Sequence, residues 1–411
     1  MLLPSALKPI PIGLAAVPRA IDLCQPVPQL QPGDPTLAAQ ALFESHRDLI
    51  SLPVVDGNRA LGLIKRRVLQ SEMAKPFRRE LFEKKSCAAF MDAAPLVIEA
   101  DTTIEQTARL VADSGSGALA DGFIIARDGA YLGVGSGLDL MRTVADLQQA
   151  RNRQIMQSID YASVIQRAML RTSLDTLQAA LPGSVMVWEP RDTVGGDFFL
   201  CAQFDGGTLV VVADCTGHGV PGAFMTLISS SWLGQALERF GPSDPALLLG
   251  ELNRKIKQSL GQVGKTDADG QSDDGLDAIV LWLDASKRRL VYAGARTPLH
   301  QLRAGQTLAT TRNTDRVGVG YVATPADYVW QNHELDLQSG DLLFAATDGL
   351  TDQVGGERGI AFGKRRLCEL LGSLDGKPAT EVAAVVSQAH RDWQGWNRRR
   401  DDLSFFCLRL S

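Results

Sequence analysis

Short apolar runs bounded by turn residues alternate with amphipathic segments along most of the chain. In the first third, an apolar run and an amphipathic segment precede two apolar strands joined by the turn "DGN" at 56–58. The same order recurs further on, where the turn is "RDG" at 127–129. An Asp-Gly turn between apolar runs is a strong short-range signal for a β-hairpin. The pattern therefore predicts two copies of a β-α-β-β-α unit, with Asp34 and Asp101 near the N-caps of their first helices.

A helical period follows between Leu138 and Leu181. Apolar residues recur there mostly every three or four positions, and no proline interrupts the segment before Pro182. We predict a long amphipathic connector whose apolar stripe pairs with a second copy of the chain as a coiled coil. The polar run "QQARNRQ" weakens the stripe, so packing of the helix against the chain's own domains is the alternative.

Composition narrows the class of protein. The chain has 411 residues, of which 45% are hydrophobic and 22% charged, which is typical of a globular protein with two or three domains. The net charge of −5 argues against a nucleic-acid-binding protein, because such proteins usually carry a concentrated basic surface. The 6 cysteines contain no CxxC pair, which favours reduced thiols over disulfides or a zinc site.

The sequence also argues against a membrane or secreted protein. No apolar run approaches the roughly 20 residues that cross a bilayer. Prolines break the mildly apolar N-terminal segment "MLLPSALKPIPIGLAAVPRA", so we interpret residues 1–19 as an irregular arm rather than a signal peptide. We expect a cytoplasmic protein without membrane or nucleic-acid partners.

Acidic residues stand at the ends of strands in the second half of the chain. The segments "GDFFLCAQF" and "TLVVVADCT" flank an Asp-Gly turn at 205–207. A two-residue loop there places Asp197 opposite Asp214, with their Cβ atoms ~5 Å apart on one face. Facing carboxylates repel each other unless a proton or a cation lies between them. A divalent cation is the occupant that we expect.

Two later strands add further carboxylates. "SGDLLFAATDGLTDQ" ends a strand at Asp348, and "DDLSFF" begins the last strand with Asp401 and Asp402. Strand-end oxygen ligands without a surrounding cluster of histidines predict a site for hard ions such as Mg²⁺ or Mn²⁺.

These segments belong to an ordered set of motifs. "WEPRDTVGGDFF", "VVADCTGHGVPGAFM", "LVYAGARTPLH", "GDLLFAATDGLTDQ" and "RDDLSFF" resemble, in order and spacing, the SpoIIE/RsbU branch of the metal-dependent (2C-type, PPM) serine/threonine phosphatases. The resemblance covers about residues 155–411 and implies an α/β fold, an α-β-β-α sandwich. It also implies hydrolysis of a phosphoserine or phosphothreonine protein, with an anti-sigma-factor antagonist of the STAS type as the expected substrate.

The resemblance assigns a role to each acidic residue. Asp197 and Asp214 would ligate two divalent cations, Mn²⁺ or Mg²⁺, with Asp214 bridging them and the backbone carbonyl of Cys215 completing one site. Asp348 would hold the second ion together with Asp401, or alternatively Asp402. These acidic residues are the predicted catalytic centre, in which a water shared by the cations attacks phosphorus.

Two other residues in these motifs have competing interpretations. Arg296 in "AGARTP" is a candidate phosphate contact, because the planar guanidinium suits phosphate oxygens, and a surface role is its alternative. His218 in the "GHG" turn is a candidate proton donor, and packing within the turn is its alternative.

The duplicated first third resembles a tandem pair of cystathionine-β-synthase (CBS) domains over residues 20–145. In that family, Gly, Ser or Thr, and Asp after the hairpin hold an adenine nucleotide, and the second copy has Gly133, Ser136 and Asp139. The first copy departs from this pattern, because Lys65 and the following arginines come after Gly62 without an acidic residue. A structural or dimerising pair is the alternative.

We therefore predict four segments: an arm (1–19), a CBS-like regulatory domain (20–145), a helical connector (146–182) and a phosphatase domain (183–411). The predicted protein is a signalling phosphatase that forms a homodimer through the connector or the CBS pair and is regulated through that pair. A catalytically inactive binding module is the alternative. A nucleotide cyclase is a remote one, because Phe198 stands where the "GGDEF" signature of cyclases needs Glu.

Overall fold

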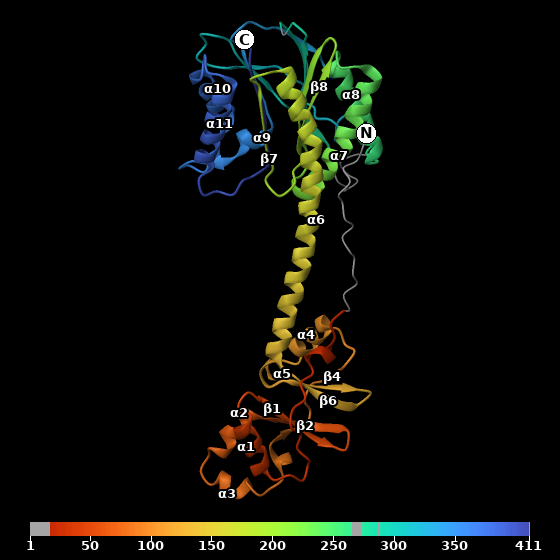
Figure 1. The fold of residues 1–411 in the computed structure, drawn as a ribbon, viewed down its shortest axis with the longest axis vertical. Coiled ribbons are helices and arrows are strands. Elements are labelled where there is room, and N and C mark those ends of the chain that lie inside the picture. Colours follow the sequence, from red (N-terminus) through yellow and green to blue (C-terminus); the bar gives the residue numbers. More distant parts are fainter. Residues whose placement is uncertain (1–16, 265–272, 287, 411) are drawn as a thin grey trace. The chain divides into compact units, whose positions relative to one another are not determined.

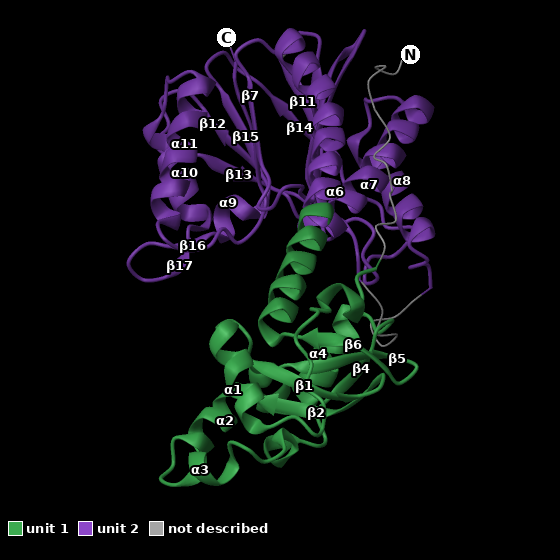
Figure 2. Cartoon of the chain, turned by 60° about the horizontal axis from the view of Figure 1, so that its bottom comes forward, with its two compact units in different colours: residues 1–154 green, residues 155–411 purple. Residues whose placement is uncertain are grey.

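The computed structural model describes residues 17–264, 273–286 and 288–410 (Figure 1). Most of the predicted N-terminal arm and most of the acidic loop at 266–275 lie outside these ranges. The chain divides into two compact units, Met1–Gln154 and Ile155–Ser411, which Figure 2 colours separately. Both units contain helices and strands, which confirms the mixed α/β fold class predicted from the sequence.

The two repeats of the first unit each contain the predicted hairpin. The first repeat comprises α1 (Thr36–Ser45), β1 (Ser51–Asp56), β2 (Arg59–Lys65) and α2 (Arg66–Met73). The second comprises β4 (Val97–Glu99), α4 (Ile104–Asp113), α5 (Ser116–Asp121), β5 (Phe123–Arg127) and β6 (Ala130–Gly135). In the second, β4 runs parallel to β5, and β5 pairs antiparallel with β6. In the first, the leading strand is reduced to one parallel bridge between Leu30 and Val54.

Short elements complete the unit: η1 (Ala20–Leu23), α3 (Arg78–Phe82), η2 (Cys87–Phe90) and β3 (Met91–Asp92). Asp34 and Asp101 lie near the N-caps of α1 and α4, as predicted, although neither is the N-cap residue itself. Pro35 is the N-cap of α1, and Thr103 caps α4 in a capping box with Gln106. Asp34 instead accepts a hydrogen bond from the backbone N–H of Gln31, and Asp101 pairs with Arg19.

The predicted connector is one uninterrupted helix, α6 (Gly137–Ala180), drawn in yellow in Figure 1. Its first turns pack in the core of the first unit through Leu140, and later turns pack in the second unit through Leu170 and Leu177. The predicted division at 145/146 falls inside this helix, so the domain boundary stays a prediction.

The second unit contains two five-stranded sheets, ordered β14-β11-β10-β9-β8 and β13-β12-β15-β18-β7. The strands of the first sheet are β8 (Asp197–Phe204), β9 (Gly207–Cys215), β10 (Leu276–Asp284), β11 (Arg289–Ala295) and β14 (His333–Asp336). Those of the second are β7 (Val185–Glu189), β12 (Leu299–Leu302), β13 (Thr310–Arg312), β15 (Leu342–Ala346) and β18 (Leu403–Arg409). The strand pairs within both sheets are antiparallel.

Apolar side chains from both sheets form a shared core, and helices cover the other face of each sheet. Val212 and Ile279 of the first sheet meet Phe406 of the second in the shared core. The helices on the first sheet are α7 (Gly219–Phe240) and α8 (Pro245–Ser259), and those on the second are α10 (Gly363–Ser373) and α11 (Ala379–Gln394). A short helix, α9 (Asp348–Asp352), and the small hairpin of β16 (Val354–Gly355) and β17 (Ile360–Ala361) follow β15.

The cysteines are free thiols, and all but Cys24 are buried. Among the described residues, no helix combines the length and apolar character that crossing a membrane requires.

Candidate active site

The hairpin of β8 and β9 has the predicted register. Asp197 pairs with Asp214 across the ladder. Asp197 is 1% exposed, and its Oδ1 atom is buried without a hydrogen-bond partner. The loop before Asp197 needs glycine, because a Cβ atom on Gly196 would lie 2.4 Å from the carbonyl oxygen of Gly217. The Gly-Gly-Asp sequence thus allows the start of β8, which carries Asp197, to pack against the turn that follows Asp214 at the end of β9.

The second sheet brings Asp348 to the same place through β15 and α9. Asp348 is the first residue of α9, and Thr347 is its N-cap. The Thr347 hydroxyl donates to Oδ2 of Asp197 at 2.9 Å and accepts from the backbone N–H of Ser404 at 3.0 Å. Thr347 therefore connects β8 of one sheet to β18 of the other at the acidic centre. Sequence reasoning missed this residue, although its place directly before Asp348 was a signal.

Asp401 and Asp402 occupy different environments. Asp402 is 2% exposed, and its oxygens accept hydrogen bonds from the backbone N–H groups of Arg191 at 2.5 Å and Gly196 at 2.6 Å. Asp402 therefore holds the loop that leads into Asp197. Asp401 accepts from the backbone N–H of Asp402 at 2.9 Å and is less deeply buried.

Crowding and burial of the acidic groups perturb their protonation. Burial, and then the charge of Asp402, raise the pKa of Asp197 to about 8. Burial together with the charges of Asp197 and Asp348 raises the pKa of Asp214 well above its ordinary value. The pKa of Asp348 is raised as well, by burial and by neighbouring Asp352. Buried carboxylates with these neighbours favour either a bound proton or a bound cation.

The carboxylates described above are ligands of the type that hard divalent cations prefer, although they do not form a complete metal site. Among the residues that the structure describes, no three His, Cys, Asp or Glu side chains lie close enough together to hold an ion as arranged. The oxygen-only chemistry of the facing acids and the unpartnered Oδ1 of Asp197 nevertheless suit Mg²⁺ or Mn²⁺.

Asp277 is a further acid at this edge, and sequence reasoning missed it. It lies on β10 directly opposite Asp214. Burial raises the pKa of Asp277 to about 6, whereas the nearby Arg296 guanidinium lowers it. The Nη1 atom of Arg296 lies 3.6 Å from Oδ1 of Asp277. The available signal was an acidic residue just after the start of an otherwise apolar strand, "LDAIVLWL".

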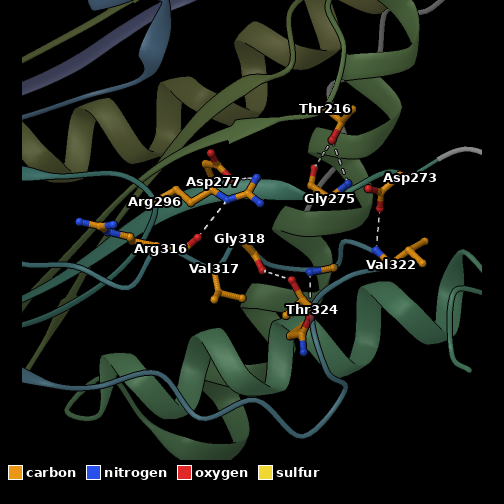
Figure 3. A network of polar contacts seen from close by, with 12 residues as sticks. Thr216, Asp273, Gly275, Asp277, Arg296, Arg316, Val317, Gly318, Val322 and Thr324 are labelled. Carbon is orange, nitrogen blue, oxygen red and sulfur yellow. Dashed lines mark hydrogen bonds and ion pairs between the residues drawn. The ribbon is translucent and has the colours of Figure 1, made fainter. Parts of the chain in front are cut away.

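Arg296 is held in an unusual conformation. Its φ of 59° lies in the left-handed region, which non-glycine residues rarely adopt. Its backbone N–H donates to the carbonyl of Asp315 at 2.7 Å, and its guanidinium lies 4.7 Å from the ring centroid of Tyr321. These contacts direct the side chain toward Asp277, as Figure 3 shows.

The loop that follows Arg316 is fastened to the start of β10 (Figure 3). Thr216 and Gly275 exchange two hydrogen bonds of 2.9 Å, one of them through the Thr216 hydroxyl. The backbone N–H of Val322 donates to Asp273 at 2.6 Å. The acidic ends of β9 and β10 are therefore fixed relative to each other, and the described end of the acidic loop has a structural role.

A cavity of about 220 Å³ opens beside these acids. Its lining includes Asp214, Asp277, Arg296, His300, Asp348 and Lys364. His300 on β12 is 2% exposed, and burial, followed by the charge of Lys364, lowers its pKa to about 4. Its Nδ1 atom lies 3.0 Å from the Thr311 hydroxyl. A neutral imidazole therefore forms part of the cavity wall.

Two residues of the motif "DCTGHG" have local roles in the described structure. Nδ1 of His218 lies 2.8 Å from Oδ2 of Asp192, and neither side chain is among those that line the cavity. The Cys215 thiol is buried 3.8 Å from the Ser229 hydroxyl, and burial raises its pKa. A protonated, buried thiol is unsuited to act as a nucleophile.

The residues predicted to bind a nucleotide lie in the first unit, where Cys24 and Gln25 of the same chain contact them. Asp139 accepts a hydrogen bond from the Gln25 amide at 2.7 Å, and its backbone N–H donates to the Ser136 hydroxyl at 3.3 Å. A Cβ atom on Gly133 would lie 2.5 Å from the sulfur of Cys24. In the first repeat, Lys65 forms an ion pair with Asp92 at 2.8 Å. Nucleotide binding stays a prediction.

Comparison with known proteins places the second unit in a family. Residues 205–411 match the family described as Stage II sporulation protein E (SpoIIE). The SiaA-PP2C domain of Pseudomonas aeruginosa is 33% identical, with 64% of this chain and 99% of that chain covered and a TM-score of 0.56. No curated protein matches the chain at a significant level.

Two further solved structures match at lower identity. The RsbU and RsbW domains of Rv1364c from Mycobacterium tuberculosis are 19% identical over 56% of this chain and 60% of that chain, with a TM-score of 0.44. The PP2C domain and a regulatory fragment of SpoIIE from Bacillus subtilis are 15% identical over 55% and 62%, with a TM-score of 0.44. The family match and the SiaA relative together show that the chain belongs to the SpoIIE family of PP2C-type serine/threonine phosphatases.

Proposed function

We propose that the chain is a two-metal protein phosphatase of bacterial signalling. Its substrate is a phosphoserine or phosphothreonine protein, with an anti-sigma-factor antagonist of the STAS type as the expected target. The observation that carries the proposal is the pairing of Asp197 with Asp214 beside Asp348, at the wall of a cavity that also contains Arg296. The proposed layers are those of an α-β-β-α sandwich with the site at one edge.

The proposed ligands are the strand-end acids. Asp197, Asp214 and the backbone carbonyl of Cys215 would hold one divalent cation, and Asp348 and Asp401 would hold the second, with Asp214 shared by both. Asp401 is preferred to Asp402 because both oxygens of Asp402 already accept backbone hydrogen bonds. Two Mn²⁺ or Mg²⁺ ions so held would acidify a shared water and neutralise phosphoryl oxygens.

The chain's own residues supply orientation and charge around the reacting phosphate. The Thr347 hydroxyl fixes the orientation of the Asp197 carboxylate by donating a hydrogen bond to it. Arg296 is the proposed phosphate contact, because it lines the cavity and its guanidinium is fixed by Asp277 and Tyr321. Fixed donors of this kind stabilise charge in the transition state without reorganising during the reaction.

Regulation is proposed to reach the site through α6. The first unit acts as a CBS-type pair, with an adenine nucleotide as its ligand, in a cytoplasmic homodimer. Within the second unit, the Gln166 side chain donates to the Gly195 carbonyl at 2.7 Å and accepts from the Gly195 N–H at 3.1 Å. A rotation or shift of α6 would therefore move the Gly-Gly loop that precedes Asp197. The exposed apolar residues Ile155 and Val164 on α6 are suited to pairing with a second copy.

The test is release of phosphate from a phosphoserine protein of the STAS type, with and without Mn²⁺ and with and without ATP or AMP. Metal-dependent turnover by the intact chain and its loss in Asp214→Asn are expected. A chain that binds the phosphoprotein without turnover would support the binding-module alternative and overturn the proposed enzyme mechanism. A rate that nucleotides leave unchanged would overturn the nucleotide part alone.

A further inference from the structure

The basic run "KRR" at 364–366 lies in the first turn of α10, and its three side chains have different environments. Arg365 points outward and pairs with Glu369 at 2.7 Å. Arg366 donates to the Phe362 carbonyl at 2.8 Å and lies 4.1 Å from the ring centroid of Trp393. Lys364 alone of the three lines the acidic cavity.

The position of Lys364 is unfavourable for the helix itself. A cation near a helix N-terminus opposes the helix dipole, and the first turn of α10 contains no acidic residue. Among the described residues, the Lys364 ammonium takes part in none of the salt bridges, unlike its neighbour Arg365. The positive charge of Lys364 nevertheless acts on the cavity wall, because it contributes to the lowered pKa of His300.

The charges around the cavity indicate what the ammonium could bind. The other cation in the lining, Arg296, already contacts Asp277. A phosphomonoester that approaches the carboxylates of Asp214 and Asp348 needs compensating positive charge beyond that of the metal ions, because its own oxygens are anionic. Lys364 approaches the same cavity from α10, an element that contributes no proposed metal ligand.

We propose that Lys364 is a substrate-binding residue whose ammonium contacts the non-bridging phosphoryl oxygens of the phosphoprotein. The assignment rests on the proposed two-metal phosphatase site. Lys364 makes this contact together with Arg296, and the ligand class is a phosphomonoester or its product, inorganic phosphate. A flexible lysine stem suits this role, because a single ammonium can follow the phosphoryl group as the bond to the leaving oxygen lengthens.

The experiment compares Lys364→Met with Lys364→Arg and with the matched control Arg365→Met, each in the full-length chain. Binding of radiolabelled inorganic phosphate is measured by equilibrium dialysis in the presence of Mg²⁺. The KM for p-nitrophenyl phosphate and for a phosphoserine protein is measured in parallel. Mg²⁺ affinity is measured by calorimetry to show that the metal site is intact.

We expect Lys364→Met to weaken phosphate binding and to raise both KM values by roughly tenfold or more, the effect of losing one hydrogen bond between charged groups. Mg²⁺ affinity should be unchanged, Lys364→Arg should restore most of the phosphate binding, and Arg365→Met should behave as the parent chain.

Other results separate the possible failures. A parent chain that turns over substrate with Mg²⁺, combined with unchanged phosphate binding in Lys364→Met, overturns the role of Lys364 and leaves the phosphatase proposal standing. An effect on the phosphoprotein KM alone also overturns it, because the contact would then be with the protein part of the substrate. A parent chain without metal-dependent turnover or phosphate binding overturns both proposals.

Discussion

Asp197 has one carboxylate oxygen bonded to Thr347 and the other buried without a partner. Such an arrangement costs folding free energy unless a proton or a cation compensates the buried charge. The raised pKa values of Asp197 and Asp214 express the same cost. The acidic centre therefore lowers the stability of the protein as long as no proton or cation compensates its charge.

Asp197→Asn should stabilise the metal-free protein at about pH 8 by on the order of 1–3 kcal/mol. The native pKa of Asp197 is raised to about 8, so the native state binds more protons than the unfolded state above the ordinary aspartate pKa. Stability of the parent chain is therefore lost as pH rises toward 8, and the amide removes this loss. Urea unfolding in a chelator, followed by Trp fluorescence, measures the difference. A variant less stable than the parent at this pH would contradict the prediction.

His300 should make the second unit sensitive to acid. Its native pKa is lowered to about 4, so the unfolded state binds more protons between that value and the ordinary histidine pKa of about 6.5. Stability is full above this window and is lost as pH falls through it, by roughly 1–3 kcal/mol. His300→Gln should show a flatter profile in urea unfolding at several pH values. Parallel profiles for the parent and the variant would refute the prediction.

At the scale of elements, close backbone approach decides how strand ends and helices meet. A Cβ atom on Gly349 of α9 would lie 1.8 Å from the Asp402 carbonyl oxygen, so α9 can rest against the start of β18 only with glycine there. The Asp402 side chain in turn fixes the Gly-Gly loop before β8. Three elements that are distant in sequence thus determine the position of one carboxylate pair.

Gln166→Leu should uncouple α6 from this loop. The variant loses both hydrogen bonds to Gly195 and leaves the buried Gly195 N–H unpaired, which costs about 1–3 kcal/mol, whereas the carbonyl keeps its hydrogen bond from Thr226. We expect Mn²⁺ affinity to fall by roughly tenfold, because the loop that positions Asp197 is no longer held. The control is Gln178→Leu, the same change at an exposed position of α6. Calorimetric titration with Mn²⁺ measures the effect, and equal affinities for the two variants would argue against this coupling.

At the scale of the whole molecule, the two units have separate cores, and α6 runs through both. The Trp residues all belong to the second unit, at positions 188, 232, 282, 330, 393 and 396. Their fluorescence therefore reports unfolding of the phosphatase unit separately from the first unit.

A fragment of residues 155–411 should fold and keep metal-dependent hydrolysis of p-nitrophenyl phosphate, because both sheets and their covering helices lie within it. We expect it to lose the nucleotide response and to dimerise more weakly than the full chain. Sedimentation velocity over a range of concentrations and steady-state kinetics measure these properties. Unchanged dimerisation, metal affinity and rate in the fragment would end the proposal that the first unit regulates the enzyme.

The sequence by itself determined the features that depend on neighbouring residues. An Asp-Gly turn between two apolar runs sets the register that pairs Asp197 with Asp214, and apolar periodicity without proline predicts α6. The family could be recognised because its motifs keep their order along the chain.

Only the tertiary structure decided which of two adjacent acids accepts hydrogen bonds from backbone groups distant in the sequence, and which basic residue of "KRR" reaches the cavity. Asp402 contacts Gly196 across 206 positions of the chain, and Asp277 meets Asp214 through pairing of β9 with β10. Such contacts depend on how two sheets pack and where a helix begins, which arise from the combined burial of many side chains. Local turn chemistry and periodicity do not reveal which distant residues such acids will meet.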